Sequence, residues 1–218
     1  MNLVVIPSVI KCINKGLSYT KIRSEYSPIE RYEQILKTIA SVKEKIPNSY
    51  IVLLECSQGI EQYENLLITL VDEYINYHDN TGVKNAVESI YKGYGESLTM
   101  YTFLKNHFKC DEPDNRYENI IKISGRYYLN DKFNYNIFNN SENIFRFYPE
   151  YNLVTTRLYK INKHYFQHYI ENYKLIVDKC ISGDSIESVI VLNLPYKRVD
   201  YLGVSGYIAI SKNEFIDE

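Results

Sequence analysis

Polar side chains follow four short apolar segments that the sequence predicts to be buried strands. In open α/β sheets, ligands bind outside the carboxyl ends of the strands, so residues directly after a strand are candidate site residues. The four groups are Pro7-Ser8, Glu55 with Ser57, Asp79-Asn80, and Ser124-Gly125-Arg126. We therefore expect a ligand site along this edge of the sheet.

The last of these groups is the most informative. Residues 120–123 lead directly into Ser124-Gly125-Arg126, where glycine permits close backbone approach and the planar fork of arginine suits a phosphate or carboxylate. Lys122 alternates with the apolar positions of the strand and could add a second cation. The alternative is that Arg126 pairs with a surface carboxylate and Gly125 only ends the strand.

A second candidate anion site is the segment Lys92-Gly93-Tyr94-Gly95-Glu96. Glycines that open a helix leave backbone amides free to meet an anion, and Lys92 would reinforce them. The alternative is a plain connector between two helices.

Two carboxylates near the end of the chain are candidates for acid–base chemistry. Asp184 and Glu187 lie three residues apart at the start of a predicted helix, where such a spacing projects to one face. One of them could remove a proton from an acceptor hydroxyl. The alternative is helix capping by Asp184 or Ser185, with Glu187 as a first-turn acid.

The sequence shows no clear metal or disulfide motif. The scattered cysteines are Cys12, Cys56, Cys110 and Cys180. Without C-x-x-C pairs they are expected to be reduced thiols in a cytosol. His164 and His168 are spaced i, i+4 but lack the H-E-x-x-H pattern, and the acidic segment 110–115 lacks the order of an EF-hand loop.

Length and charge narrow the class of protein. The 218 residues suit one α/β domain, and 45% hydrophobic content predicts a folded core. A net charge of −2 without a basic run argues against nucleic acid or an anionic membrane as partner. The apolar start, residues 3–10, is too short for a signal peptide or a membrane span, so a cytoplasmic protein is expected.

The first half of the chain predicts a β-α-β unit. Residues 3–6 form a continuous apolar run typical of a strand buried on both faces. Ser27-Pro28-Ile29-Glu30 combines a capping serine, a proline at the first helical position and a capping-box glutamate, and the helix then runs to Pro47. A second buried strand at 50–54 completes the unit, which begins a doubly wound sheet.

The remaining pattern extends this arrangement. The predicted elements are a helix over 60–70, a strand over 73–77, a helical pair over 83–108 broken at Gly93-Tyr94-Gly95, strands over 119–123 and 152–161, and helices over 165–180 and 185–192. The polar stretch 130–142 is the best candidate for a mobile loop. The sequence thus predicts an α/β fold with a mostly parallel, Rossmann-type sheet flanked by helices.

Taken together, these motifs resemble small GT-A-type glycosyltransferases of large DNA viruses and bacteria, including those implicated in glycosylating viral capsid proteins. The matching segments are Arg31-Tyr32-Glu33-Gln34-Ile35 through Ile39, Ile46-Pro47-Asn48-Ser49-Tyr50, Leu54-Glu55-Cys56-Ser57, Lys92-Gly93-Tyr94-Gly95-Glu96, and Lys122-Ile123-Ser124-Gly125-Arg126-Tyr127. The resemblance covers roughly the first two-thirds of the chain in order.

The resemblance implies a single GT-A-like domain over 1–218 that transfers a sugar from a UDP- or GDP-sugar to a hydroxyl of a glycan or glycoprotein, in the host cytoplasm if the protein is viral. Residues 1–130 would bind the nucleotide sugar and 131–218 the acceptor, with Asp184 or Glu187 as catalytic base. The implied donor-binding residues are Ser8, Glu55, Ser57, Lys92, Glu96, Lys122, Ser124, Gly125 and Arg126.

The chain departs from this family at one informative place. In many GT-A enzymes the strand that corresponds to residues 120–123 ends in an Asp-x-Asp motif, which holds Mn²⁺ or Mg²⁺ against the diphosphate. Here Ser124-Gly125-Arg126 stands in that place, so the motif is absent although either metal remains possible. Our hypothesis is that Arg126 and Lys92 neutralise the leaving diphosphate directly.

Two other classes of function are alternatives to sugar transfer. The first is a non-catalytic module that keeps the nucleotide-sugar fold, which an occluded or uncharged cleft at Arg126 would favour. The second is a tyrosine-rich nucleic-acid binder, because aromatic side chains stack on bases. Such a binder needs a cationic groove, and the net charge of −2 argues against it.

Overall fold

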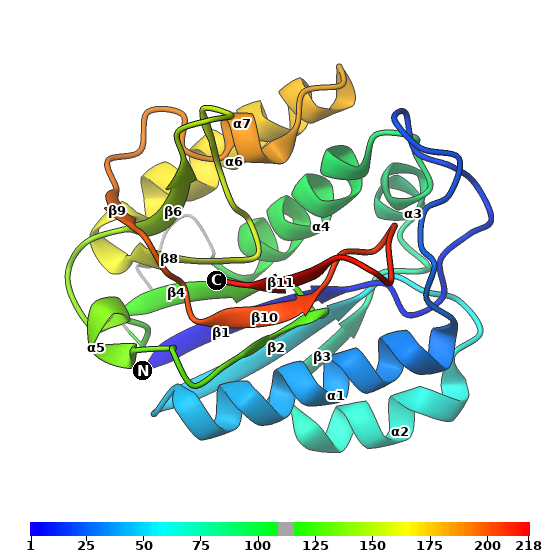
Figure 1. Ribbon diagram of the computed structural model, residues 1–218, viewed down its shortest axis with the longest axis horizontal. Helices are drawn as coiled ribbons and strands as arrows, with labels where there is room; N and C mark the ends of the chain where they lie inside the picture. The colour runs from blue at the N-terminus through cyan, green and yellow to red at the C-terminus, as the bar shows by residue number, and fades with distance from the viewer. Residues whose placement is uncertain (109–115) are drawn as a thin grey trace.

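The computed structural model describes residues 1–108 and 116–218 and is built around one large mixed sheet (Figure 1). Its strands are β1 (Asn2–Ser8), β2 (Ser49–Glu55), β3 (Glu73–Asn76), β4 (Asn119–Ile123), β6 (Ile144–Tyr148), β7 (Leu153–Val154), β8 (Leu158–Asn162) and β9 (Lys197–Val199). Their order is β3-β2-β1-β4-β8-β6-β7, and β9 pairs with β6. The first four are mutually parallel, and β8 continues the sheet antiparallel to β4.

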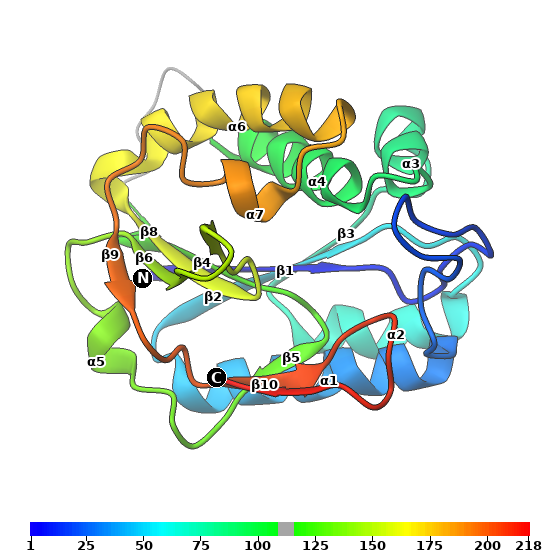
Figure 2. The same ribbon diagram turned by 45° about the horizontal axis from the view of Figure 1, so that its top comes forward.

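Helices cover both faces of this sheet. They are α1 (Pro28–Lys45), α2 (Glu61–Leu70), α3 (Thr81–Val87), α4 (Lys92–His107), α5 (Tyr135–Phe138), the 3₁₀ turn η1 (Lys163–Tyr165), α6 (Phe166–Ile181) and α7 (Ile186–Val189). Figure 2 shows α1 and α2 on one face and α3, α4, α6 and α7 on the other. Alternate residues of β1 enter two separate cores, Leu3 and Val5 on the α4 side and Val4 and Ile6 on the α1 side.

The start of α1 has the cap that its sequence predicts. The Ser27 hydroxyl accepts a hydrogen bond from the Glu30 amide, and the Glu30 carboxylate accepts one from the Ser27 amide at 2.8 Å. This reciprocal pair satisfies two amide donors that a helix start otherwise leaves unpaired.

Replacing this cap should weaken the fold without touching any candidate site residue. We expect Ser27→Ala to lower the free energy of unfolding by about 1 kcal/mol, because the Glu30 amide loses its partner. Urea unfolding followed by circular dichroism measures the change, with Ser141→Ala, at an exposed serine outside the capping box, as the control. An unchanged midpoint in Ser27→Ala would show that the cap contributes nothing in this protein.

A second, smaller sheet lies against α1 and was not predicted. It consists of β5 (Tyr127–Leu129), β10 (Val204–Tyr207) and β11 (Phe215–Asp217), all antiparallel. The Thr38 hydroxyl donates to the carbonyl of Tyr127 at 2.7 Å, and the Leu129 amide donates to the Ser41 hydroxyl at 3.0 Å. These bonds anchor the strand that follows Ser124-Gly125-Arg126 to the helix.

The predicted elements in the first half are confirmed, with one correction. The helical pair over 83–108 exists, but it breaks at residues 88–91 rather than at Gly93-Tyr94-Gly95. Gly93 and Gly95 lie in the first turn of α4, and Gly95 permits close packing, because a Cβ there would come within 2.8 Å of the Val87 Cα.

The second half departs further from the prediction. The strand predicted over 152–161 is wrong as one element, since β7 and β8 are separate and joined by residues 155–157. The stretch 130–142, predicted as a mobile loop, contains α5, whose Phe138 is buried. The acidic segment 110–115 lies outside the described residues. Within the described ranges, every helix is too short or too polar to cross a lipid bilayer.

Candidate functional site

A cavity of about 750 Å³ lies at the carboxyl ends of β1, β2 and β4, and we refer to it as the main cavity. Lys92 and Glu96 reach it from the first turns of α4. The predicted donor-binding residues that line it are Ser8, Ser57, Lys92, Glu96, Ser124, Gly125 and Arg126. The fold therefore brings together residues from three of the four polar groups that follow predicted strands and from the Lys92–Glu96 segment.

A long loop, residues 9–26, folds over one side of the main cavity next to α3 (Figures 1 and 2). Arg23 fastens this loop, because its Nη1 donates to the Val87 carbonyl at 2.8 Å. Arg31 of α1 is buried and donates through Nε to the Val9 carbonyl. Both guanidinium groups line the cavity, so its wall carries more positive charge than the sequence motifs predicted.

An ion pair that is buried on its lysine side lies at the floor of the cavity. Lys122 of β4 contacts Glu96 of α4 through Nζ and Oε1, and the Lys122 side chain has no exposed surface. Burial raises the pKa of Glu96, but Lys122, Lys92 and Arg126 outweigh it and lower the pKa below its usual value. Glu96 is therefore ionised at neutral pH.

Lys92 and Arg126 are the cations that face the cavity above this pair. The side chain of Lys92 is exposed to the cavity, yet the surrounding protein lowers its pKa, mainly through desolvation and further through Arg126. Arg126 is half-buried, and its described hydrogen bond is a long one of 3.5 Å to the Tyr207 carbonyl. Among the residues that the structure describes, no carboxylate forms an ion pair with Lys92 or Arg126, so these two cations suit an anionic ligand.

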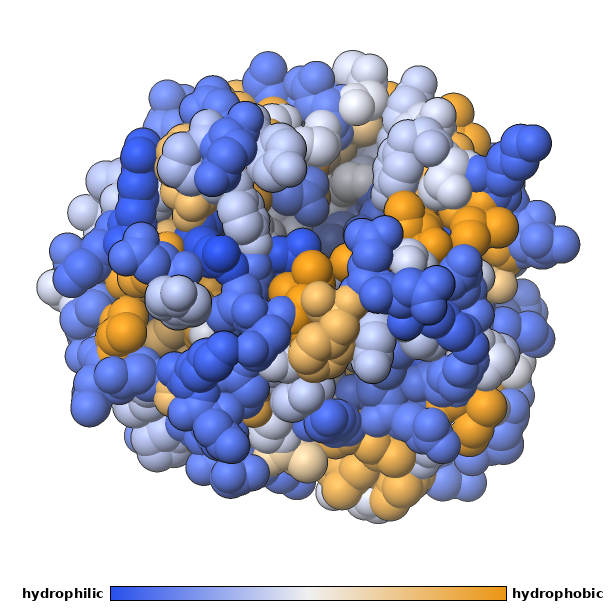
Figure 3. Space-filling view, in the orientation of Figure 1, coloured by the Kyte–Doolittle hydropathy of each residue, from blue (hydrophilic) through white to orange (hydrophobic). Residues whose placement is uncertain are grey.

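A second hollow of about 490 Å³ adjoins the main cavity, and we refer to it as the side hollow. Figure 3 shows the surface hollowed on this face, with apolar side chains along the rim. The side hollow shares Lys92, Glu96, Ser124 and Arg126 with the main cavity. Its other polar and aromatic lining residues are Tyr19, Tyr127, Tyr148, Tyr151, Thr155, Thr156, Arg157 and Glu187.

Glu187 enters the side hollow because α7 packs closely on the start of α4. A Cβ on Gly93 would come within 3.1 Å of the Ile186 amide, so only glycine allows this approach without a shift. The Glu187 Oε1 accepts a hydrogen bond from the Thr156 hydroxyl at 3.1 Å. The carboxylate is half-buried and lies near enough to Lys92 and Tyr19 to influence the pKa of both.

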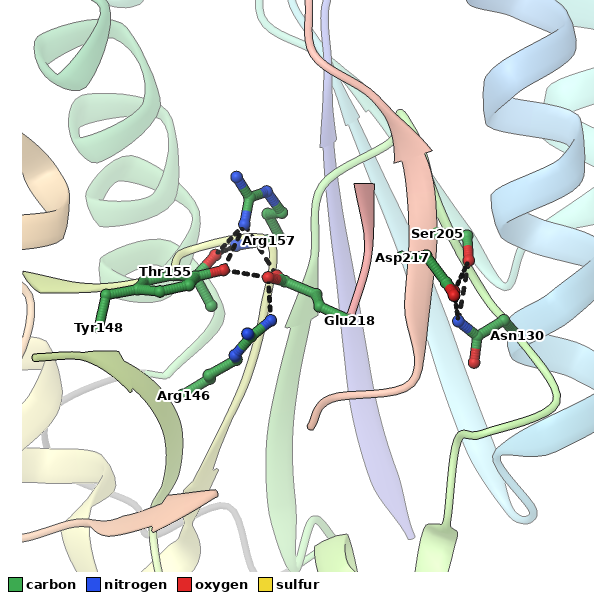
Figure 4. Close-up of polar contacts among 8 residues, drawn as sticks. All are labelled: Asn130, Arg146, Tyr148, Thr155, Arg157, Ser205, Asp217 and Glu218. Atoms are coloured by element: carbon green, nitrogen blue, oxygen red, sulfur yellow. Dashed lines mark hydrogen bonds and ion pairs between the residues drawn. The ribbon is translucent and has the colours of Figure 1, made fainter. Parts of the chain in front are cut away.

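A buried carboxylate fixes the far wall of the side hollow (Figure 4). Glu218 is 5% exposed as a side chain and accepts from Arg157 Nη1 at 2.8 Å, from Arg146 and from the Tyr148 hydroxyl. Burial lowers the pKa of Arg157, but Glu218 outweighs it and raises the pKa. The cluster joins β6 and the β7–β8 turn to the end of β11, which connects the two sheets.

The ring of Tyr127 lies near two arginines, with the guanidinium carbons of Arg126 and Arg157 at 5.4 and 5.6 Å from its centroid. Burial raises the pKa of its phenol, but Arg126, Arg157 and Lys92 outweigh that effect and lower it. Tyr127 is 3% exposed and lines the side hollow, so it belongs to the wall of that hollow.

Three predicted site residues lie outside both cavities. Glu55 is fully buried, and its Oε1 accepts from the amides of Ile10, Cys56 and Ser57 at 2.9–3.0 Å, so it shapes the turns after β1 and β2. Lys122 lies beneath the floor. Asp184 is exposed, precedes α7 and lines neither cavity, whereas Glu187 lies inside the helix.

Sequence reasoning missed several lining residues, most clearly Arg31, Thr156 and Arg157. Arg31 belongs to the segment Arg31–Ile35 that carries the family resemblance. The direction of its side chain toward Val9 depends on how the loop of residues 9–26 folds. Thr156 and Arg157 occur where the sequence predicted a continuous strand, so the turn that presents them was not expected. The signal that could have revealed this turn was Arg157, a charged residue that interrupts the predicted strand.

The described residues at this place contain no preformed group of metal ligands. Nowhere among them do three or more His, Cys, Asp or Glu side chains gather as a metal site. Glu96, the carboxylate on the cavity floor, already has Lys122 as its partner. His168, which the sequence spaces with His164, instead contacts the Asn193 carbonyl through Nε2 at 2.7 Å.

Cysteine chemistry offers a simple probe of the main cavity. Burial raises the pKa of Cys56 to about 12 and that of Cys180 to about 11, whereas Cys12 is half-buried and lines the cavity. We expect iodoacetamide at pH 8 to alkylate Cys12 well before Cys56 and Cys180, because thiolates react and buried thiols stay protonated. Peptide mapping by mass spectrometry measures the order. Equal rates at all three would contradict the described burial.

No family model matches the sequence, and no curated protein matches it. Among solved structures, the apo form of the glycosyltransferase GlyE from Streptococcus pneumoniae TIGR4 aligns with a TM-score of 0.51 at 12% identity, over 91% of this chain and 44% of that chain. The CTP:phosphocholine cytidylyltransferase LicC from Streptococcus pneumoniae aligns with a TM-score of 0.50 at 11% identity, over 94% and 92%.

These likenesses define the class of fold. The chain has a Rossmann-type α/β fold with a mostly parallel sheet flanked by helices, of the kind that GT-A glycosyltransferases and nucleotidyltransferases share. The prediction of a GT-A-like fold class is therefore confirmed. The chain spans less than half of the length of GlyE but nearly all of LicC.

Proposed function

We propose that this protein is a glycosyltransferase that moves a sugar from a nucleoside-diphosphate sugar, with UDP- and GDP-sugars as the first candidates, to a hydroxyl of a glycan or glycoprotein. The observation that carries the proposal is the pairing of two adjoining cavities. The main cavity is rich in cations, the side hollow contains a carboxylate, and Lys92 and Arg126 lie on their shared boundary.

In this proposal the main cavity holds the donor. Ser8 and Ser57 face the nucleoside, and Lys92 and Arg126 contact the diphosphate, where their charge stabilises the leaving group as the sugar–phosphate bond breaks. Ser124 and Gly125 form the cavity wall at the same edge, and Glu55 acts from beneath by shaping the loops. The lining comes almost entirely from residues 1–130, which we assign as the donor half.

The side hollow then holds the acceptor. Its lining comes largely from residues 131–218, the proposed acceptor half of one GT-A-like domain. Glu187 takes the proton of the acceptor hydroxyl while that oxygen forms the new bond to the anomeric carbon. The Thr156 hydroxyl orients the carboxylate by donating to Oε1 at 3.1 Å. Attack from the side hollow, opposite the diphosphate, would invert the anomeric centre.

Two alternative functions compete with the glycosyltransferase proposal. A non-catalytic module was expected to show an occluded or uncharged cleft at Arg126, but the cleft is open and charged. A nucleotidyl transfer reaction is favoured by one observation, because the chain matches LicC over 92% of that protein's length. Such a reaction would release pyrophosphate from a nucleoside triphosphate instead of a nucleoside diphosphate from a sugar donor.

A thermal-shift screen followed by turnover measurements tests the proposal. A ligand that binds only the native state must raise the melting temperature. We expect stabilisation by one family of UDP-, GDP- or dTDP-sugars and slow release of the matching nucleoside diphosphate. Pyrophosphate release from a nucleoside triphosphate with a sugar phosphate would favour the nucleotidyltransferase, and no shift with any nucleotide would refute both enzymes.

A further inference from the structure

The buried ammonium of Lys122 is surrounded by oxygen atoms, as a bound cation would be. Its Nζ donates to the Glu96 Oε1, to the Ser124 hydroxyl at 2.8 Å and to the Thr156 carbonyl at 2.5 Å. These three partners use all three N–H bonds of a protonated lysine. The side chain is completely buried, so Lys122 does not reach a ligand in either cavity.

Stability of the fold does not account for this lysine. Burying an ion pair costs desolvation that its attraction often fails to offset, and apolar replacements of similar volume are commonly neutral or stabilising. The isoleucines around Lys122 are fully buried, and Ile120, which lies on the same face of β4, shows that this face accommodates an aliphatic side chain. A lysine here points to a role in the electrostatics of the cavity above it.

The charged side chains around the cavity floor indicate what this electrostatic role of Lys122 is. Lys92 and Arg126 line both cavities together with Glu96, and Lys92 lies one helical turn before Glu96 on α4. Without Lys122, the Glu96 carboxylate would have to pair with one or both of these cations. With Lys122 in place, Glu96 is neutralised from below, and Lys92 and Arg126 keep their positive charge for a ligand.

We propose that Lys122 is a built-in cation of the donor site, which holds Glu96 so that Lys92 and Arg126 remain free for the diphosphate and no divalent metal is needed there. This inference rests on the proposed donor-binding function. Lys122 is a positioning residue, since it acts through Glu96 and not on the ligand.

The same ammonium links the two cavities. Thr156 accepts from Lys122 through its carbonyl and donates to Glu187 through its hydroxyl. The chain Glu96–Lys122–Thr156–Glu187 therefore couples the floor of the main cavity to the proposed base in the side hollow. Loss of Lys122 is expected to disturb both sites.

A double-mutant cycle on nucleotide binding tests the inference. Calorimetry measures the binding of UDP, GDP and dTDP to the wild-type protein in EDTA and in Mn²⁺, and to Lys122→Met, Glu96→Gln and the double variant in EDTA. We expect wild-type binding to be equal under both conditions. Lys122→Met should weaken it about tenfold or more, because Glu96 then captures the cations, and the double variant should return to within about threefold of wild type.

Each outcome separates the inference from a structural role. If the double variant binds as weakly as Lys122→Met, Lys122 acts through packing and the inference is wrong. Should Lys122→Met fail to fold, Glu96→Gln decides, since binding at wild-type strength or tighter supports the inference and a loss of about tenfold overturns it. Wild-type binding that requires Mn²⁺ also overturns it, whereas no nucleotide binding under any condition refutes the proposed function itself.

Discussion

Arg126→Ala is expected to lower kcat/KM for sugar transfer by about 100- to 1,000-fold, the loss typical of removing one fixed charge donor from a transition state. Arg126 lines both cavities and has one long hydrogen bond to the Tyr207 carbonyl, so its guanidinium is available to a ligand. Its planar fork matches two phosphate oxygens, which a lysine ammonium cannot do. Steady-state release of the nucleoside diphosphate measures the effect.

Two further variants show whether a loss of activity in Arg126→Ala is specific to this side chain and its shape. Arg126→Lys keeps the charge but loses the fork, so its activity should lie between those of Arg126→Ala and wild type. Arg198→Ala removes an exposed arginine that lines neither cavity and is the matched control. If Arg126→Ala keeps full turnover, the hypothesis that a cationic clamp neutralises the diphosphate fails.

The first half of the fold could be predicted because the sequence signals for its strands and helices are local. Strand β1 is a continuous apolar run, and the Ser27 and Glu30 capping box defines the start of α1 within four residues. The strands of the small sheet lack such signals. Strand β11 consists of three residues, of which Phe215 and Asp217 are exposed, and it exists because its backbone pairs with β10.

The candidate site likewise contains residues that could be placed from the sequence and residues that could not. Residues at or just beyond the carboxyl ends of parallel strands, such as Ser8 and Arg126, reach one cavity because the register of a parallel sheet places strand ends together. Arg157 could not be placed, since its direction depends on Glu218, which follows β11 and lies 61 residues away in the sequence. Asp184 and Glu187 were expected on one helical face, but that rule holds only within a helix, and α7 begins at Ile186.

Glu187→Gln should have an effect on transfer comparable to or larger than that of Arg126→Ala. The change keeps the size of the side chain and an oxygen that can accept from Thr156, but it removes the basic carboxylate. Loss of a general base lowers turnover by about 100- to 10,000-fold. We therefore expect kcat to fall by that factor, while binding of the donor nucleotide, measured by calorimetry, stays near the wild-type value.

The matched control for this variant is Asp184→Asn. Asp184 carries the same charge three residues earlier but is exposed outside both cavities, so transfer should be unchanged. A loss confined to Glu187→Gln with donor binding intact places the proton transfer in the side hollow. A loss confined to Asp184→Asn would mean that α7 rearranges when substrates bind, and the acceptor site would then have to be sought beside the exposed start of that helix.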